Sequence, residues 1–147
     1  TSTLTAPAGG ITVGADGSVS IGGAVRGDSV TMTADDDLDT SALIDADNGD
    51  VSLTAGEDAV IGATVDASSD ITIGAGQDLV INGAVGDTTG VNVTLTADTG
   101  SITTNARVEG SNEVTLTAGQ NMTIGGNIEA VAGLNDYTQK FIQGGYD

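Results

Sequence analysis

The side chains that could do chemistry in this sequence are almost all carboxylates. The chain has 21 Asp and Glu residues and only three Lys and Arg, and it contains no Cys or His. Carboxylate oxygens are ligands that Ca²⁺ prefers, and a pair of carboxylates can also hydrolyse glycosides. Catalysis by a thiol nucleophile or an imidazole base is excluded, because the residues that perform it are absent.

Five of the acids recur at intervals of about twenty residues and predict a Ca²⁺ site. If the repeats stack, successive carboxylates stand about 4.8 Å apart and repel one another, unless a cation bridges them. The alternative is that these side chains accept hydrogen bonds from turn N–H groups and are otherwise solvated. The sequence leaves both explanations open, and no other cofactor is expected. The candidate Ca²⁺ ligands are Asp37, Asp58, Asp78, Asp50 and Asp70.

A second candidate is the tripeptide Arg26-Gly27-Asp28, which integrins recognise when it projects from a tight turn. It falls between two apolar positions, Val25 and Val30, where we expect an exposed corner. The motif has three residues, so it also arises by coincidence in a chain rich in Gly and Asp. The two explanations are a binding loop for a host-cell receptor and a plain turn.

Composition restricts the class of protein and its partners. The formal net charge of −18 disfavours nucleic acid and anionic membranes, since both require a basic surface. No apolar run approaches the length of a membrane span, so membrane insertion is not expected. Apolar residues make up 38% of the chain and are strictly patterned, which indicates an ordered acidic β protein.

A repeat of about twenty residues organises the whole sequence. Val-Thr-Leu-Thr-Ala or a close variant occurs six times, and a period of this length is typical of solenoids. Within each copy apolar and polar residues alternate, as in a strand with one buried face. A second short strand and one last apolar residue complete each repeat. The six copies occupy Ile11–Ala15, Val30–Ala34, Val51–Ala55, Ile71–Ala75, Val93–Ala97 and Val114–Ala118.

These repeats predict an all-β fold, a right-handed parallel β-helix of about six coils. We expect a partial coil over residues 1–10 and the β-helix over residues 11–133. Residues 134–147 contain all three aromatic residues, and we expect them to form a lid or to lead into another module. Thr40 and Thr104 stand where the repeat otherwise has an apolar residue, so each is a weak point or bonds its hydroxyl to backbone.

Pairs of outward-facing threonines recur along the first strand of the repeat. A Thr-x-Thr ladder is typical of some ice-binding proteins, but Gly14 and Gly74 interrupt it here. Thr is also simply a favourable residue for an exposed strand, and the sequence alone favours that explanation. Catalysis is not expected either, because the evenly short loops provide no cleft for a substrate.

Segments such as Ala75-Gly76-Gln77-Asp78-Leu79 and the stretch from Leu116 to Ile124 resemble the repeats of filamentous haemagglutinin-type adhesins. These are large bacterial exoproteins, often exported by two-partner secretion. The resemblance covers residues 10–130 and implies a rod-like β-helical shaft on a secreted or surface-anchored protein. The secretion domain of that family has no counterpart in this sequence.

Together these observations predict a structural shaft or filament-forming segment with an extracellular or cell-surface location. Neither end carries a polar cap, so we expect neighbouring coils of a longer chain to be its partners. Self-association into filaments is a further expectation. The alternative function is a cell-adhesion module that uses the Arg26-Gly27-Asp28 loop and is stabilised by Ca²⁺.

Overall fold

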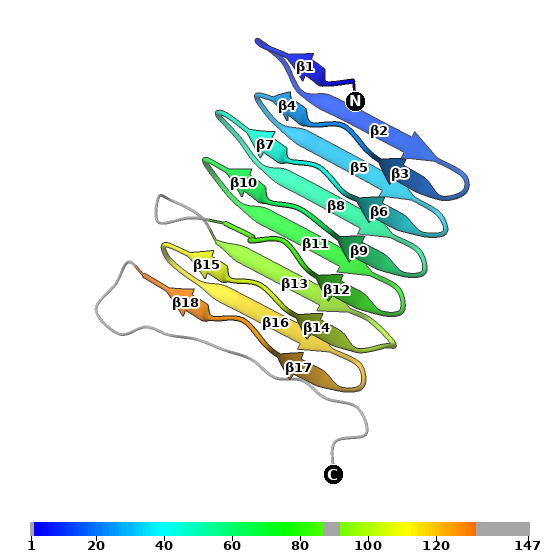
Figure 1. Ribbon diagram of the computed structural model, residues 1–147, viewed down its shortest axis with the longest axis vertical. Coiled ribbons are helices and arrows are strands. Elements are labelled where there is room, and N and C mark those ends of the chain that lie inside the picture. The colour runs from blue at the N-terminus through cyan, green and yellow to red at the C-terminus, as the bar shows by residue number, and fades with distance from the viewer. Residues whose placement is uncertain (1, 87–91, 132–147) are drawn as a thin grey trace.

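The fold is a right-handed parallel β-helix, as the sequence predicts. The computed structural model describes residues 2–86 and 92–131, and every regular element in these ranges is a β-strand. The chain winds through three sheets in turn, and each coil stacks on the one before it (Figure 1). About six turns of about 21 residues follow one another along a single axis.

The first sheet, here called sheet 1, contains the five-residue strands of the repeat. They lie in the order β16-β13-β11-β8-β5-β2, and all neighbours are parallel. The register aligns identical repeat positions, so Ile11 pairs with Val30, and Val30 pairs with Val51. The strands are β2 (Ile11–Ala15), β5 (Val30–Ala34), β8 (Val51–Ala55), β11 (Ile71–Ala75), β13 (Val93–Ala97) and β16 (Val114–Ala118).

Sheet 2 contains the second strand of each coil, which is three residues long. Its register pairs Leu79 with Ile102, although Ile102 comes one residue late in the repeat. The turn before Ile102 therefore absorbs the extra residue without shifting the sheet. The strands are β3 (Val19–Ile21), β6 (Leu38–Thr40), β9 (Ala59–Ile61), β12 (Leu79–Ile81), β14 (Ile102–Thr104) and β17 (Met122–Ile124).

Sheet 3 is the main difference between the sequence pattern and the structure. The pattern predicts two strands and one apolar residue per coil, whereas the structure has a third strand that begins at that apolar residue. This strand has only two inward positions, and the second is small, as at Gly27 and Ala46, so alternation is not visible in the sequence. The strands are β1 (Leu4–Ala6), β4 (Val25–Gly27), β7 (Ile44–Ala46), β10 (Val65–Ala67), β15 (Val108–Gly110) and β18 (Ile128–Ala130).

Strand β1 belongs to residues 1–10, where the sequence predicts a partial coil. It pairs with β4 in the same parallel register as the later strands of sheet 3. Further along this sheet, single bridges from Val85 to Val65 and to Val108 connect β10 with β15. Sheet 3 thus continues along the axis even where one coil has no full third strand.

The core is a single aliphatic column enclosed by the three sheets. Its largest fully buried side chains are Met, Leu and Ile from sheets 1 and 2, together with Ile44 of sheet 3. Each coil has too little apolar surface to be stable alone, but stacking makes the buried stripe continuous. Thr40 and Thr104 lie within this column, are 0% exposed, and have hydroxyl oxygens without a hydrogen-bond partner. They are therefore the weak points that the sequence predicts.

Close stacking of the coils also requires glycine at certain turns. A Cβ atom added to Gly76 would lie 2.0 Å from the carbonyl oxygen of Gly56, in the coil before it. Gly86 has a φ of 77°, and its added Cβ would meet the carbonyl oxygen of Glu109 at 2.0 Å. A Cβ atom added to Gly74, in contrast, would meet no other atom within 4 Å.

Candidate functional site

The first acidic column forms a ladder of hydrogen bonds along the turn between sheets 1 and 2. The amide of Asp58 donates to Oδ1 of Asp37 at 3.3 Å, and the amide of Asp78 donates to Oδ1 of Asp58 at 2.9 Å. The amide of Ser101 then donates to Oδ1 of Asp78 at 2.7 Å. Each carboxylate therefore satisfies the N–H group at the same position of the next coil.

The second acidic column repeats this arrangement before sheet 1. The amide of Asp70 donates to Oδ1 of Asp50 at 3.0 Å. The amide of Asn92 donates to Oδ1 of Asp70 at 3.2 Å, and the side-chain Nδ2 of Asn92 donates to the same oxygen at 2.8 Å. Asn92 is thus an uncharged member of the ladder and stabilises the carboxylate above it.

These hydrogen bonds give the five candidate Ca²⁺ ligands a structural role. All five residues are exposed, so water solvates the oxygen that the turn does not use. Within residues 2–86 and 92–131, no group of three or more Asp, Glu, His or Cys is arranged to hold a metal ion. The geometry supports the explanation in which acids bind turn amides, and Ca²⁺ binding stays a prediction.

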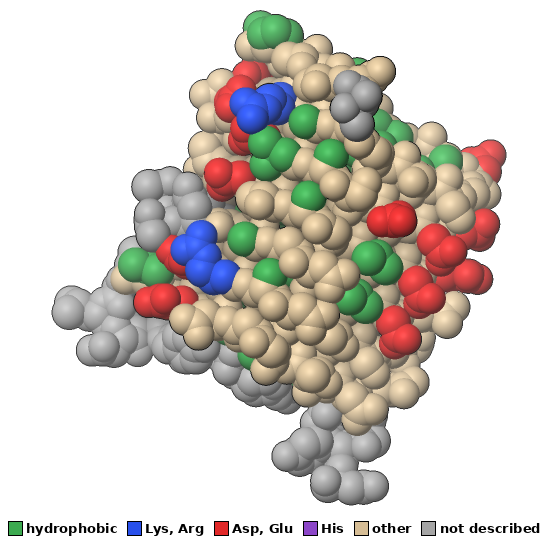
Figure 2. All heavy atoms as spheres, viewed as in Figure 1, with side chains coloured by type: hydrophobic (Ala, Val, Ile, Leu, Met, Phe, Trp, Pro, Cys, Tyr) green, Lys and Arg blue, Asp and Glu red, His purple; other side chains and the backbone are tan. Residues whose placement is uncertain are grey.

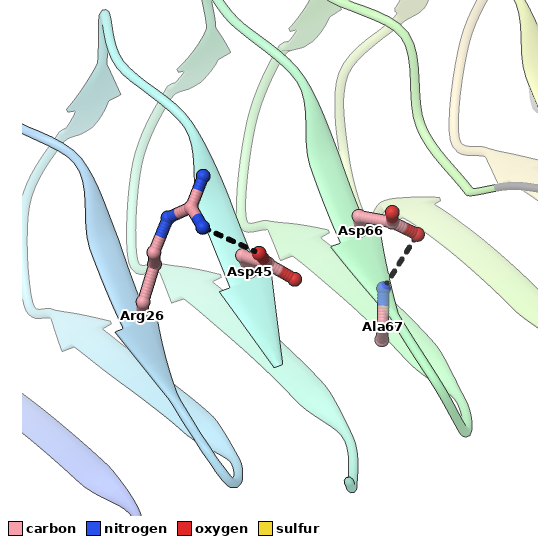
Figure 3. Close-up of polar contacts among 4 residues, drawn as sticks. All are labelled: Arg26, Asp45, Asp66 and Ala67. Carbon is pink, nitrogen blue, oxygen red and sulfur yellow. Dashed lines mark hydrogen bonds and ion pairs between the residues drawn. The ribbon is translucent and has the colours of Figure 1, made fainter. Parts of the chain in front are cut away.

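The Arg26-Gly27-Asp28 motif does not form the exposed corner that the sequence predicts. Arg26 and Gly27 lie in strand β4, and Gly27 is buried. The side chain of Arg26 is 51% exposed and forms an ion pair with Asp45 of the neighbouring strand β7, at 3.7 Å between Nη1 and Oδ2 (Figure 3). The sequence pattern misses this because sheet 3 itself is not visible in it.

Asp28 follows strand β4 and forms hydrogen bonds with the coils on both sides of it. Its amide donates to the carbonyl oxygen of Gly9 at 2.9 Å, and its Oδ1 accepts a hydrogen bond from Nδ2 of Asn48 at 2.9 Å. The two charged groups of the motif therefore have partners within the solenoid. Arg26 and Asp28 would have to leave these partners in order to bind a receptor together.

The outward side chains of sheet 3 form a charged column that sequence reasoning missed. Arg26, Asp45 and Asp66 are aligned by the register of β4, β7 and β10. In Figure 3 the carboxylate of Asp66 turns toward its own strand, where it accepts a hydrogen bond from the amide of Ala67 at 2.9 Å. The spacing of these residues places them at the same position of successive repeats, but it does not show that this position lies in a strand.

A later strand of sheet 3 carries a buried acid. Glu109 of β15 is 3% exposed and forms an ion pair with Arg107, whose side chain is 46% exposed. A buried carboxylate requires such a partner, since removal from water is costly for an unpaired charge. The ion pair between Arg107 and Glu109 therefore has a structural role.

Charge is unevenly distributed around the solenoid. Figure 2 shows basic side chains along one side of the view and a row of acidic side chains along the opposite side. The basic groups are Arg26, which lies in β4 of sheet 3, and Arg107, which directly precedes β15 of the same sheet. The acidic row belongs to the turn between sheets 1 and 2, where one carboxylate ladder runs.

Two further observations bear on the class of protein. In the part of the chain that the structure describes, no helix is long and apolar enough to cross a membrane. No family model matches the chain, and no curated protein or solved structure matches it. The resemblance to filamentous haemagglutinin-type repeats therefore rests on the sequence motifs alone.

Proposed function

We propose that this chain is a structural shaft or filament-forming segment of a bacterial secreted or surface adhesin. The observation that carries the proposal is the uninterrupted stacking of equivalent coils, with one continuous core from β2 to β16. In such a solenoid the length depends only on the number of coils, because each coil adds about 4.8 Å to the axis. A rod of this kind can hold a functional tip away from a cell.

The charge distribution supports an extended rod that stays apart from its copies. The net charge of −18 makes rods repel one another in solution. Within each rod, the repulsion between stacked carboxylates is offset by the hydrogen bonds that they accept from turn amides. The same side chains thus favour solubility and stable turns. We propose no catalytic role, because the acids of the two ladders accept hydrogen bonds from turn amides and the buried Glu109 pairs with Arg107.

The location of the natural protein tests this proposal. Antibodies raised against the 147-residue chain should label the surface of intact cells, or extracellular filaments, by immunogold electron microscopy. An antibody against a cytoplasmic protein serves as the control for cell lysis. Labelling confined to the interior of cells, with intact surfaces unlabelled, would contradict an extracellular shaft.

The alternative is a cell-adhesion module that uses Arg26, Gly27 and Asp28. One observation favours it: the Arg26 side chain is half exposed on the surface. The partners of Arg26 and Asp28 within the solenoid oppose it. Surfaces coated with the wild-type chain and with Asp28→Glu should support equal attachment of mammalian cells. Attachment that requires Asp28 would favour the adhesion module over the inert shaft.

A further inference from the structure

The outward face of sheet 1 differs from the rest of this acidic molecule because it carries no charge. Twelve positions face outward from its six strands, and ten of them are Thr or Ser. The other two are glycines. We call this surface the hydroxyl face. Its first row contains Thr12, Thr31, Ser52, Thr72, Thr94 and Thr115, and its second row contains Gly14, Thr33, Thr54, Gly74, Thr96 and Thr117.

The other two sheets show that this is not a general property of the solenoid. Four of the six strands of sheet 3 have an acid at the middle, outward position, and a fifth has Arg26. The corresponding positions of sheet 2 mix Ser20, Asp39, Val60 and others. A face that combines hydroxyl groups at nearly every position with the absence of charge is therefore specific to the longest and most regular sheet.

The hydroxyl face is also a regular two-dimensional lattice. Every pair of neighbouring strands in sheet 1 is parallel and in exact repeat register, so the hydroxyl groups recur about every 4.8 Å along the axis. Along each strand the two rows are two residues apart, or about 6.6 Å. Each Thr also carries a methyl group, which makes the face partly apolar.

These spacings are close to those of a tetrahedral water network. Water oxygens joined by hydrogen bonds of about 2.75 Å place next-nearest oxygens about 4.5 Å apart and repeat a layer every 7.3 Å or so. The differences from the hydroxyl lattice are about 0.3 Å and 0.7 Å per step, so along the axis the mismatch reaches the radius of a water molecule, about 1.4 Å, only after about five coils. Rotation of the hydroxyl groups can absorb such differences over neighbouring coils.

The residues around the hydroxyl face indicate which of three partners it suits: a second copy of the chain, a glycan or ice. A second copy packed face to face would bring acidic turns against acidic turns, which opposes dimers. Glycan binding usually relies on aromatic side chains, and the described part of the chain has none. An ice surface has neither requirement. At one end of the hydroxyl face, Glu113 comes close enough for its Oε1 to accept a hydrogen bond from Oγ1 of Thr115 at 3.0 Å. Exposed acids at the turns flanking sheet 1 include Asp16, Asp35, Asp36, Asp50, Glu57, Asp70, Asp98 and Glu113.

We propose that the hydroxyl face binds ice. The lattice of Thr hydroxyl and methyl groups holds a layer of ordered water that matches a plane of the crystal. The regular register favours binding because the water on the face is ordered before it meets the ice. The absence of charge favours binding because no charged group on the face has to lose its hydration. The proposal does not depend on the shaft function, since it concerns one surface of the solenoid.

Incorporation into slowly growing ice tests the proposal directly. The wild-type chain should enter the ice at the concentration of the solution, whereas a non-binding protein is pushed into the remaining liquid. Thr31→Lys with Thr54→Lys places two bulky charges on the hydroxyl face and should cause exclusion. Ser20→Lys with Thr123→Lys makes the same change of charge at exposed positions of sheet 2 and should leave incorporation unchanged.

A gain-of-function variant provides an independent arm. Gly14→Thr with Gly74→Thr completes the second row, and an added Cβ at either position meets no atom within 4 Å. We expect this variant to inhibit ice recrystallisation at a lower concentration than the wild type. Far-UV circular dichroism verifies that all three double variants retain the β fold.

Several outcomes would overturn the proposal. Exclusion of the wild-type chain from ice would do so, as would equal incorporation of the folded sheet 1 and sheet 2 variants. A dimer in sedimentation experiments that only the sheet 1 variant abolishes would identify the face as a contact between copies. Binding of the wild type to insoluble polysaccharide, lost in the same variant, would identify a glycan surface instead.

Discussion

Replacing the two buried threonines with valine should make the solenoid more stable. Thr40 and Thr104 are completely buried, and their hydroxyl oxygens have no hydrogen-bond partner. The register places Ile21 and Ile61 beside Thr40, so the surroundings are apolar on both sides. Val has the shape of Thr with a methyl group in place of the hydroxyl, and it fits the same space.

The magnitude follows from the cost of a buried polar group without a partner. Such a group costs about 1–3 kcal/mol, so Thr40→Val should raise the free energy of unfolding by about 1.5 kcal/mol, and Thr104→Val should do the same. For a chain of this size, that corresponds to a rise in melting temperature of about 4 °C. The two sites are three strand spacings apart, about 14 Å, so their effects should add.

Urea unfolding at 25 °C, followed by far-UV circular dichroism, measures these changes. Thr33→Val is the matched control, because Thr33 is exposed on β5 and the change there should stay within about 0.5 kcal/mol. A loss of stability in Thr40→Val or Thr104→Val would refute the reasoning. It would mean that the buried hydroxyls have partners, such as an internal water, and contribute to the core.

Three further predictions follow from the turns. Asp58→Ala should lower the free energy of unfolding by about 1 kcal/mol. Asp58→Asn keeps an acceptor for the amide of Asp78 and should not lower it. An equal loss of stability in both variants would mean that the charge of Asp58 matters and not its hydrogen bond. Gly76→Ala should lower the free energy of unfolding by about 1–3 kcal/mol, because the added Cβ clashes with the carbonyl oxygen of Gly56. Gly74→Ala should leave the free energy of unfolding nearly unchanged. Equal urea midpoints for the two variants would contradict this prediction. Millimolar Ca²⁺ should raise the melting temperature, measured by calorimetry, no more than Mg²⁺ does. The reason is that the carboxylates of the two columns already accept hydrogen bonds from turn amides. A large rise that is specific to Ca²⁺ would reveal a cation site.

The repeat allowed most of the core to be predicted from the sequence. Side chains on a strand alternate between two faces, so apolar residues at every second position identified the inward columns of sheets 1 and 2. Leu79 pairs with Ile102 although Ile102 comes one residue late in its repeat, so the register follows the apolar residue and not the residue count. These predictions succeed because stacking forces equivalent residues of successive coils into contact, which makes the pattern redundant.

Sheet 3 and the contacts around it could not be predicted in the same way. A three-residue strand with a small second inward residue, such as Val25–Gly27, has no visible period. The ion pair between Arg26 and Asp45 depends on that strand. The burial of Glu109 depends on its packing and on its pair with Arg107, neither of which has a local signature. Sequence also left two roles open for the acidic columns, because distinguishing them requires hydrogen-bond geometry.

Changing the number of coils tests the solenoid shaft most directly. Residues 51–70 form one complete coil, and the register pairs Val51 with Ile71, so extra copies can be inserted between residues 70 and 71 without a new junction. Three extra copies should lengthen the rod by about 14 Å at an unchanged cross-section, as measured by small-angle X-ray scattering. An unchanged length with a wider cross-section, or loss of the β spectrum, would contradict a shaft whose reach depends on its number of coils.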